Sequence, residues 1–112
     1  MSRIAGKEYE EIACRYLKAK GFNILERNVN YGFAEIDVIA KLKKTLVFVE
    51  VKGGNPDFPP RLRINRQKLK KIEMAANRYI SIKKPYFESC RLDVIEVLSN
   101  GRINHIDGVG GW

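Results

Sequence analysis

Asp37, Glu50 and Lys52 are charged residues inside segments that are otherwise typical of buried β-strands. Residues 34–41 and 45–53 are rich in Val, Ile and Phe, and the polar residues between them suit a turn, which predicts a β-hairpin. Both segments are apolar at nearly every position, as in strands covered on both faces. Because an unpaired buried charge costs on the order of several kcal/mol, these side chains require partners or a bound ion.

The position of the turn decides which of these side chains meet. With the turn centred at residues 43–44, Asp37 lies across from Glu50, and Glu35 lies across from Lys52. Side chains directly opposite one another have Cβ atoms about 4.5–5.5 Å apart, and like charges there destabilise the sheet. We therefore expect a cation between the two carboxylates. A register shifted by one residue would place them on opposite faces of the sheet.

Two carboxylates and a lysine at this spacing suit the hydrolysis of a phosphodiester. Carboxylate oxygens are hard ligands, appropriate for Mg²⁺ or Mn²⁺. A divalent cation can neutralise charge on the phosphate and deliver a hydroxide-like nucleophile. The alternative is a buried charge network that fixes the hairpin register, but two or three acids with one lysine would leave negative charge uncompensated.

Asp37, followed thirteen positions later by Glu50-Val51-Lys52, resembles the D…(D/E)-x-K signature of the PD-(D/E)xK nuclease superfamily. The segments GKEYEE, ERN, AEIDVIA, VFVEVK and RLDV also occur in the order seen in the short bacterial YraN-like proteins, which are similar to archaeal Holliday junction resolvases. This resemblance covers the chain from about Gly6 to Ile106.

The resemblance implies a fold, an activity and a set of site residues. The fold is an α/β restriction-endonuclease-like α-β-β-β-α-β core, with a mixed central sheet of four to five strands flanked by helices. The activity is divalent-metal-dependent endonucleolytic hydrolysis of DNA, including branched or structured DNA. The implied catalytic residues are Asp37, Glu50, Lys52 and Glu8.

The resemblance also implies how the metal is held. Asp37, Glu50, Glu8 and the backbone carbonyl of Val51 would bind Mg²⁺ or Mn²⁺. Lys52 would orient or deprotonate the attacking water, or stabilise charge on the phosphate. Glu35 is secondary, as an ion-pair partner for that lysine. Glu8 has a structural alternative, because a glutamate in the first turn of a helix also complements the helix dipole.

The periodicity predicts the order helix, three strands, helix, and one or two strands. Asn65 is placed to cap the second helix. A loop that begins at Gly53 and contains three prolines precedes this helix. The predicted elements cover residues 6–20, 22–29, 34–41, 45–53, 65–83, 91–99 and 102–106.

The chain is strongly basic. It has 112 residues, which suits one domain (1–112), and its 21 Lys and Arg against 13 Asp and Glu give a net charge of +8. The electric field of a protein with this positive charge attracts polyanions, so nucleic acid, and DNA in particular, is the expected partner. The expected contacts are Arg61, Arg63, Arg66 and Lys68, since guanidinium groups suit bidentate phosphate contacts. A soluble basic protein rich in Lys and Glu is the alternative on charge alone.

The sequence also indicates where the protein is located and how it could assemble. No apolar run approaches the roughly 20 residues of a membrane span, and the amino terminus lacks the apolar segment of a signal peptide, so we expect a cytoplasmic protein that binds no membrane. A homodimer is expected if the substrate is a four-way junction, which needs two active sites. A catalytically silent nucleic-acid-binding module and a protein-interaction scaffold remain alternatives on the same fold.

Three other residues are expected to be structural. Arg91 and Asp93 share a strand face, which favours an internal ion pair over catalysis. His105 is the single histidine, and a lone strand histidine is more typical of a structural residue.

Overall fold

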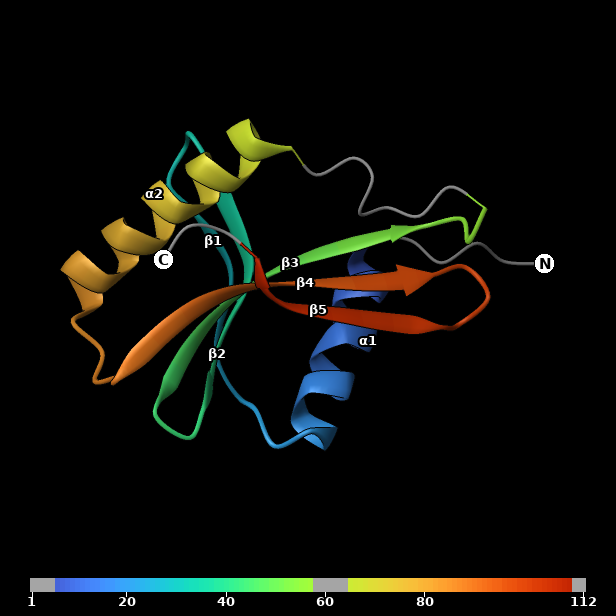
Figure 1. Cartoon of the computed structure of the whole chain (residues 1–112), viewed down its shortest axis with the longest axis horizontal. Coiled ribbons are helices and arrows are strands. Elements are labelled where there is room, and N and C mark those ends of the chain that lie inside the picture. The colour runs from blue at the N-terminus through green and yellow to red at the C-terminus, as the bar shows by residue number, and fades with distance from the viewer. Residues whose placement is uncertain (1–5, 58–64, 110–112) are drawn as a thin grey trace.

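The structure is a computed structural model that describes residues 6–57 and 65–109. Within these residues, five strands form one mixed sheet in the order β1-β2-β3-β4-β5, and the β3–β4 pair is the only parallel one among them. The elements along the chain are α1 (Gly6–Ala19), β1 (Asn23–Asn30), β2 (Glu35–Leu42), β3 (Thr45–Gly54), α2 (Arg66–Lys83), β4 (Ser89–Leu98) and β5 (Ile103–Val109) (Figure 1). The predicted mixed α/β architecture with a sheet of four to five strands flanked by helices is confirmed.

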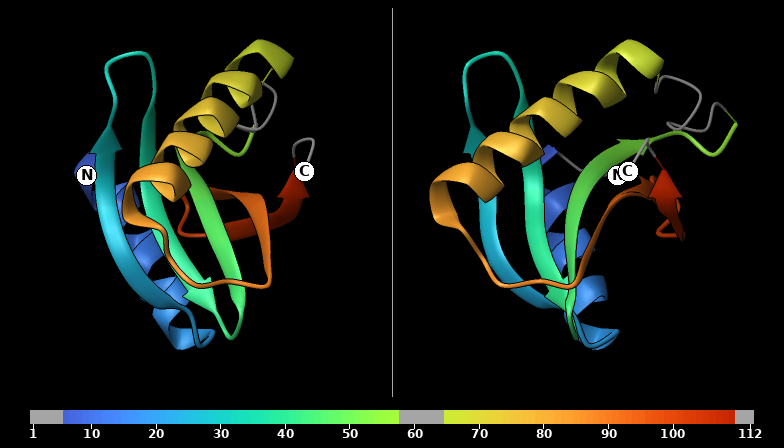
Figure 2. Two further views of the ribbon diagram at one scale, coloured as in Figure 1. Left: turned by 90° about the vertical axis from the view of Figure 1, so that its left-hand side faces the viewer. Right: turned by 60° about the vertical axis from the view of Figure 1, so that its left-hand side comes forward.

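The two helices cover opposite faces of the sheet (Figure 2), so the middle strands are buried on both sides. The core on the α1 side includes Ala13, Leu17, Val38, Val49 and Ile95. The core on the α2 side includes Ile39, Phe48, Ile72, Tyr79 and Leu92. This double coverage explains why β2 and β3 are apolar at nearly every position. Within the described residues, neither helix is long and apolar enough to cross a lipid bilayer.

Helix α2 begins where the sequence predicts. The Asn65 side-chain oxygen accepts a hydrogen bond from the backbone N–H of Lys68 at 2.8 Å, which confirms the predicted N-cap. The helix ends at Lys83, and the C-cap residue Lys84 has a left-handed backbone (φ 48°) and donates its N–H to Ile80 O at 2.9 Å. Helix α2 connects the parallel strands β3 and β4, so the chain crosses back along the sheet after β3. The first turn of α2 therefore lies near the carboxyl-terminal end of β3.

The hairpin register is confirmed over the turn-proximal half of β2 and β3. Leu42 pairs with Thr45, and Val38 pairs with Val49, in register with a turn at residues 43–44. The ladder then ends, and β2 continues along β1, where Glu35 pairs with Asn30. The predicted position of Glu35 across from Lys52 is therefore wrong, because the two strands separate before they reach it.

Strand β3 is longer than predicted. Gly53 was expected to end the strand and begin the loop, but Gly53 and Gly54 both continue the parallel pairing, with Val97 and Leu98 of β4. The side of Gly53 that would carry a Cβ faces the ring of Tyr9 on α1, with no room for another atom. A glycine here thus allows the first turns of α1 to approach β3 closely.

Replacing Gly53 with alanine is expected to destabilise the protein by about 1–3 kcal/mol, the usual range for overpacking. The new methyl group would collide with the Tyr9 ring. Urea unfolding of wild type, Gly53→Ala, Tyr9→Ala and the double variant measures this coupling. The alanine should cost markedly less when Tyr9 is absent. An equal cost in both backgrounds would contradict the steric explanation.

Candidate active site

Asp37 and Glu50 meet where β2 parts from β3. The backbone N–H of Val51 donates a hydrogen bond to Asp37 Oδ2 at 2.8 Å, which holds this carboxyl group over the end of the β2–β3 ladder. Glu50 is only 6% exposed. Burial, and then the neighbouring Glu50 carboxyl, raise the pKa of Asp37 to about 7, although the Val51 N–H opposes the shift. Asp37 and Glu50 are therefore so close together, and so far shielded from water, that ionising both carboxyl groups at once is unfavourable.

Two lysines reach the same oxygen of Glu50. Lys52 Nζ lies 3.5 Å from Glu50 Oε1, and Lys68 Nζ, from the first turn of α2, lies 3.6 Å from it. The Lys52 side chain is mostly buried, with 19% of its surface exposed. Burial, and then the neighbouring Lys68, lower the pKa of Lys52, while Glu50 partly opposes this. The site thus contains a lysine that gives up its proton more readily than usual.

A third acid comes from α1, and it is Glu10. Glu10, Glu35 and Asp37 can each offer a carboxylate oxygen, with these atoms all within 4.8 Å of one another. Glu8, the predicted helix acid, is exposed and is not part of this group. The cluster therefore brings together side chains from α1 and β2.

The helix periodicity explains the correction from Glu8 to Glu10. Glu10 lies three and four residues before Ala13 and Cys14, both of which are buried against the sheet. Residues at these spacings share one helix face. Glu8 lies two positions earlier, which rotates it to the solvent side. The position of the buried stripe along α1 was the signal that could have identified Glu10 from the sequence.

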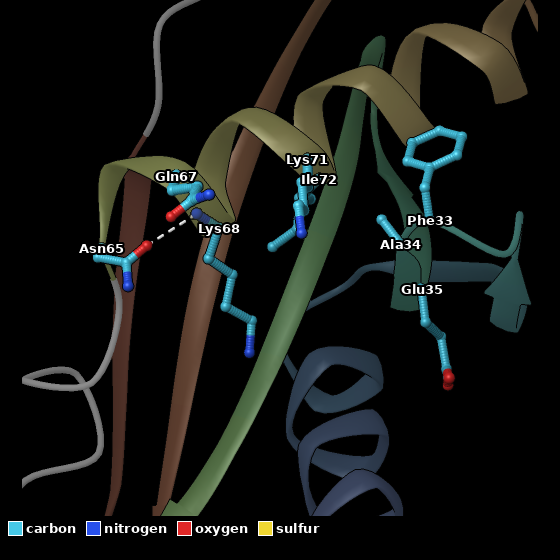
Figure 3. A pocket seen from close by; sticks show the side chains of 8 residues that line it. All are labelled: Phe33, Ala34, Glu35, Asn65, Gln67, Lys68, Lys71 and Ile72. Carbon is cyan, nitrogen blue, oxygen red and sulfur yellow. Dashed lines mark hydrogen bonds between the residues drawn. The ribbon is translucent and has the colours of Figure 1, made fainter.

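An open pocket of about 390 Å³ lies beside the acids, between α2 and the segment that connects β1 to β2 (Figure 3). It contains Glu35 from the acid cluster and Lys68 from the Glu50 ion pair, so it is continuous with the site. The described lining residues are Phe33, Ala34, Glu35, Asn65, Gln67, Lys68, Lys71 and Ile72.

The predicted phosphate-binding residues divide into two groups. Lys68 lies at the site. Arg66 is the first residue of α2, two positions before Lys68, and its side chain is exposed. Arg61 and Arg63 lie outside the described residues.

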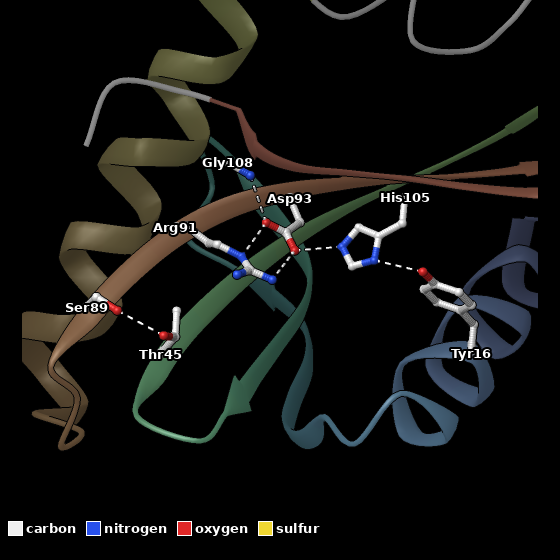
Figure 4. Close-up of polar contacts among 7 residues, drawn as sticks. All are labelled: Tyr16, Thr45, Ser89, Arg91, Asp93, His105 and Gly108. Atoms are coloured by element: carbon white, nitrogen blue, oxygen red, sulfur yellow. Dashed lines mark hydrogen bonds and ion pairs between the residues drawn. The ribbon is translucent and has the colours of Figure 1, made fainter.

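Another acidic residue of the sheet, Asp93, lies on β4 and is fully paired (Figure 4). Arg91 donates from Nε to Asp93 Oδ1 at 2.9 Å and from Nη2 to Oδ2 at 3.2 Å, which confirms the predicted ion pair. His105 Nε2 lies 2.7 Å from Oδ2, and Gly108 N–H donates to Oδ1 at 3.2 Å. Tyr16 Oη contacts the other ring nitrogen of His105 at 3.0 Å. Burial alone would raise the pKa of Asp93, but the hydrogen bonds from His105, Arg91 and Gly108 outweigh it and lower the pKa. The Asp93 carboxylate therefore has a structural role.

Glu96 is a buried acid for which the sequence predicted no role. It is fully buried on β4, beside Lys52 in the parallel register, and accepts a hydrogen bond from Asn104 Nδ2 at 3.2 Å. No short turn sets the β3–β4 register, so nothing local in the sequence indicated that Glu96 would lie next to Lys52.

Comparison with known proteins identifies the family. The family described as "Uncharacterised protein family UPF0102" matches residues 9–97. A UPF0102 protein of Kosmotoga olearia is 62% identical over 112 residues, which is 100% of this chain and 97% of that protein. UPF0102 proteins of Pseudothermotoga lettingae and Thermotoga maritima are 52% and 40% identical, each over 103 residues that make up 92% of this chain and 95% and 94% of those proteins. The chain therefore belongs to the UPF0102 family.

Proposed function

We propose that this protein is a Mg²⁺- or Mn²⁺-dependent endonuclease that hydrolyses DNA phosphodiester bonds, on a restriction-endonuclease-like core of the PD-(D/E)xK superfamily. The observation that carries the proposal is the meeting of the half-buried Asp37 carboxyl group with the buried Glu50 carboxyl group, with Lys52 Nζ 3.5 Å from the second. The strand-borne acid followed by Glu-x-Lys on the next strand is the arrangement that the superfamily signature requires.

The residues of the site fit a divalent cation. Asp37, Glu50 and Glu10 would supply carboxylate oxygens, and the Val51 carbonyl would supply a backbone oxygen, all of them ligands that Mg²⁺ and Mn²⁺ accept. Without a cation, the pKa of Asp37 rises to about 7, mainly through burial and then through Glu50. A bound dication would remove this conflict of charges, and it would also polarise the phosphate and lower the pKa of a bound water.

Lys52 is the residue best suited to handle the proton of the attacking water. Its lowered pKa, caused by burial and Lys68, makes the neutral amine more accessible. Its contact with Glu50 keeps the amine at the carboxylate that would hold the metal. Lys68 is more exposed, at 38%, and would instead neutralise a phosphate oxygen of the substrate.

The charge of the chain supports DNA as the partner. The net charge of +8 attracts a polyanion, and exposed basic residues continue from the site along α2. They are Arg66, Lys70, Lys71 and Arg78. If a four-way junction is the substrate, the two cleavages require two copies of the site and hence a homodimer.

Mn²⁺ affinity is expected to increase about tenfold for each pH unit between about pH 5 and 7 and to level off above pH 7, because one proton on Asp37 competes with the metal. Since the folded-state pKa of Asp37 is raised, the metal-free protein gains stability from this proton at low pH and loses it as the pH rises through 7. Added Mn²⁺ should therefore raise the melting temperature more at pH 8 than at pH 5.5. Calorimetric titration and thermal unfolding across this range measure both effects.

Asp37→Asn is the matched control for this pH dependence. It retains the shape of the side chain but cannot lose a proton, so the remaining Mn²⁺ affinity should be weak and nearly independent of pH in this window. A wild-type affinity that does not change between pH 5.5 and 8 would contradict the assignment of Asp37 as a ligand.

The direct test of the proposed function is cleavage of linear, flapped and four-way DNA with Mn²⁺, and with EDTA as the control. Cleavage of any of these substrates only with the metal supports an endonuclease. Salt-dependent binding without cleavage of any topology would instead favour the silent DNA-binding module. No binding at low salt would favour a protein-interaction scaffold.

A further inference from the structure

The pocket beside the acids has the size of a ligand site. Its volume of about 390 Å³ falls within the range of about 300–1,000 Å³ that is typical of small-molecule pockets. The β1–β2 connection forms one wall and the first turns of α2 form the other (Figure 3). One wall of the pocket carries an aromatic ring and the other carries positive charge. This difference indicates what kind of ligand the pocket can bind.

One wall carries an exposed aromatic ring. Phe33 is 39% exposed, although the ring belongs to a residue type that is usually buried. Arg78 lies over this ring at 5.6 Å and over the Tyr31 ring at 5.9 Å, which fixes the connection against α2. Arg78 is not among the described residues that line the pocket, so the Phe33 ring contributes to the pocket independently of this contact. A held, half-exposed ring is suited to stack against a flat ligand.

The other wall carries the positive charge. Lys68 and Lys71 come from successive turns of α2 and face the pocket with Asn65 and Gln67, which can hydrogen-bond. Among the described lining residues the single acid is Glu35, which belongs to the cluster with Glu10 and Asp37. A ligand with a planar group and a phosphate therefore matches the two walls, with the phosphate on the side of the candidate metal ligands.

We propose that this pocket binds one unpaired nucleotide of the DNA substrate, with the base against Phe33 and its phosphate at Lys68 and Lys71. The inference rests on the proposed function, because it identifies the DNA that the same site would cut. A base within a duplex is stacked on both faces, whereas a base outside the stack has a free face for the ring. Substrates with a gap, bulge or single-stranded flap contain such a nucleotide.

The test is DNA binding in EDTA, measured by fluorescence anisotropy, with a duplex that carries one unpaired nucleotide and the fully paired duplex of the same sequence. Wild type should bind the bulged duplex about tenfold more tightly, the size expected for one base–aromatic stack. Phe33→Ala should lose this preference, and Phe33→Trp should keep it. Free deoxynucleoside monophosphate at the concentration of the DNA should not compete.

Tyr86→Ala is the matched control. Tyr86 is also an exposed aromatic residue, at 65%, with a lysine, Lys41, over its ring at 5.0 Å, but it does not line the pocket. This variant should retain the full preference for the bulged duplex. Equal loss in Tyr86→Ala and Phe33→Ala would overturn the proposal, as would an unchanged preference in Phe33→Ala, equal binding of both duplexes by wild type, or displacement by the free nucleotide.

Wild-type cleavage with Mn²⁺ separates this proposal from the proposed function. A Phe33-dependent preference without cleavage of the bulged duplex would retain the nucleotide pocket and overturn the nuclease. Metal-dependent cleavage with no preference for the unpaired nucleotide would retain the nuclease and overturn the pocket.

Discussion

Glu50→Gln is expected to reduce Mn²⁺-dependent DNA cleavage by more than about 100-fold, because loss of even a residue that only supports a metal ligand costs about 10- to 100-fold. The amide retains the volume of the side chain, so the buried end of β3 keeps its packing. The neutral amide has no negative charge, so it can neither hold the metal as the carboxylate would nor form ion pairs with Lys52 and Lys68. Single-turnover cleavage of the best substrate from the topology panel measures the loss.

DNA affinity should not fall in the same variant. Removing a negative charge from beneath two lysines leaves them more available to phosphate, so anisotropy in EDTA should show equal or tighter binding. Glu88→Gln is the matched control, since Glu88 also pairs with a lysine, Lys44 at 3.8 Å, but at an exposed position away from the site. Full cleavage activity in Glu50→Gln, or a comparable loss in Glu88→Gln, would contradict the assigned role of Glu50.

Asp93→Ala is expected to destabilise the fold by about 3–5 kcal/mol, the cost of removing one partner from a buried ion pair. Asp93 is fully buried, and its loss leaves Arg91, His105 and the Gly108 N–H without their shared acceptor. Urea unfolding at pH 7 measures the change in the free energy of unfolding. A loss below about 1 kcal/mol, the scale of an exposed pair, would contradict a structural role for this network.

Asp93→Asn separates charge from shape at the same position. The pKa of Asp93 is lowered by hydrogen bonds from His105, Arg91 and Gly108, which outweigh the opposing effect of burial. The stabilisation from its charge is therefore present above the unfolded pKa of 3.8 and is lost as the pH falls through the lower folded value. The difference in stability between wild type and Asp93→Asn should accordingly shrink as the pH is lowered from 5 towards 3.

Local sequence predicted the hairpin well because its register depends on a two-residue turn. Once the turn is at residues 43–44, period-2 alternation determines that Asp37 and Glu50 approach one another. The same rule failed for Glu35, because it assumes that the two strands remain paired. The structure instead ends the ladder at Val38 and Val49, and the separation of the strands is what makes room at the acids.

Contacts between distant segments were harder to predict. The choice between Glu8 and Glu10 depends on the rotation of α1 about its axis, which its packing on the sheet determines. The sequence predicted that Lys68 would contact phosphate. Its proximity to Glu50 depends on the path from β3 to α2, and no periodicity encodes that path. The pocket beside the acids depends on the same path, since its two walls come from segments thirty or more residues apart.

The sharing of Glu50 between two ammonium groups has a consequence for the order in which ligands bind. A phosphate that draws Lys68 away would leave this carboxylate with Lys52 alone and increase its attraction for a metal ion. Thermodynamic linkage then requires the metal ion to strengthen phosphate binding by the same factor. Substrate and metal would then load cooperatively, with a metal affinity that is higher when DNA is bound than when it is absent.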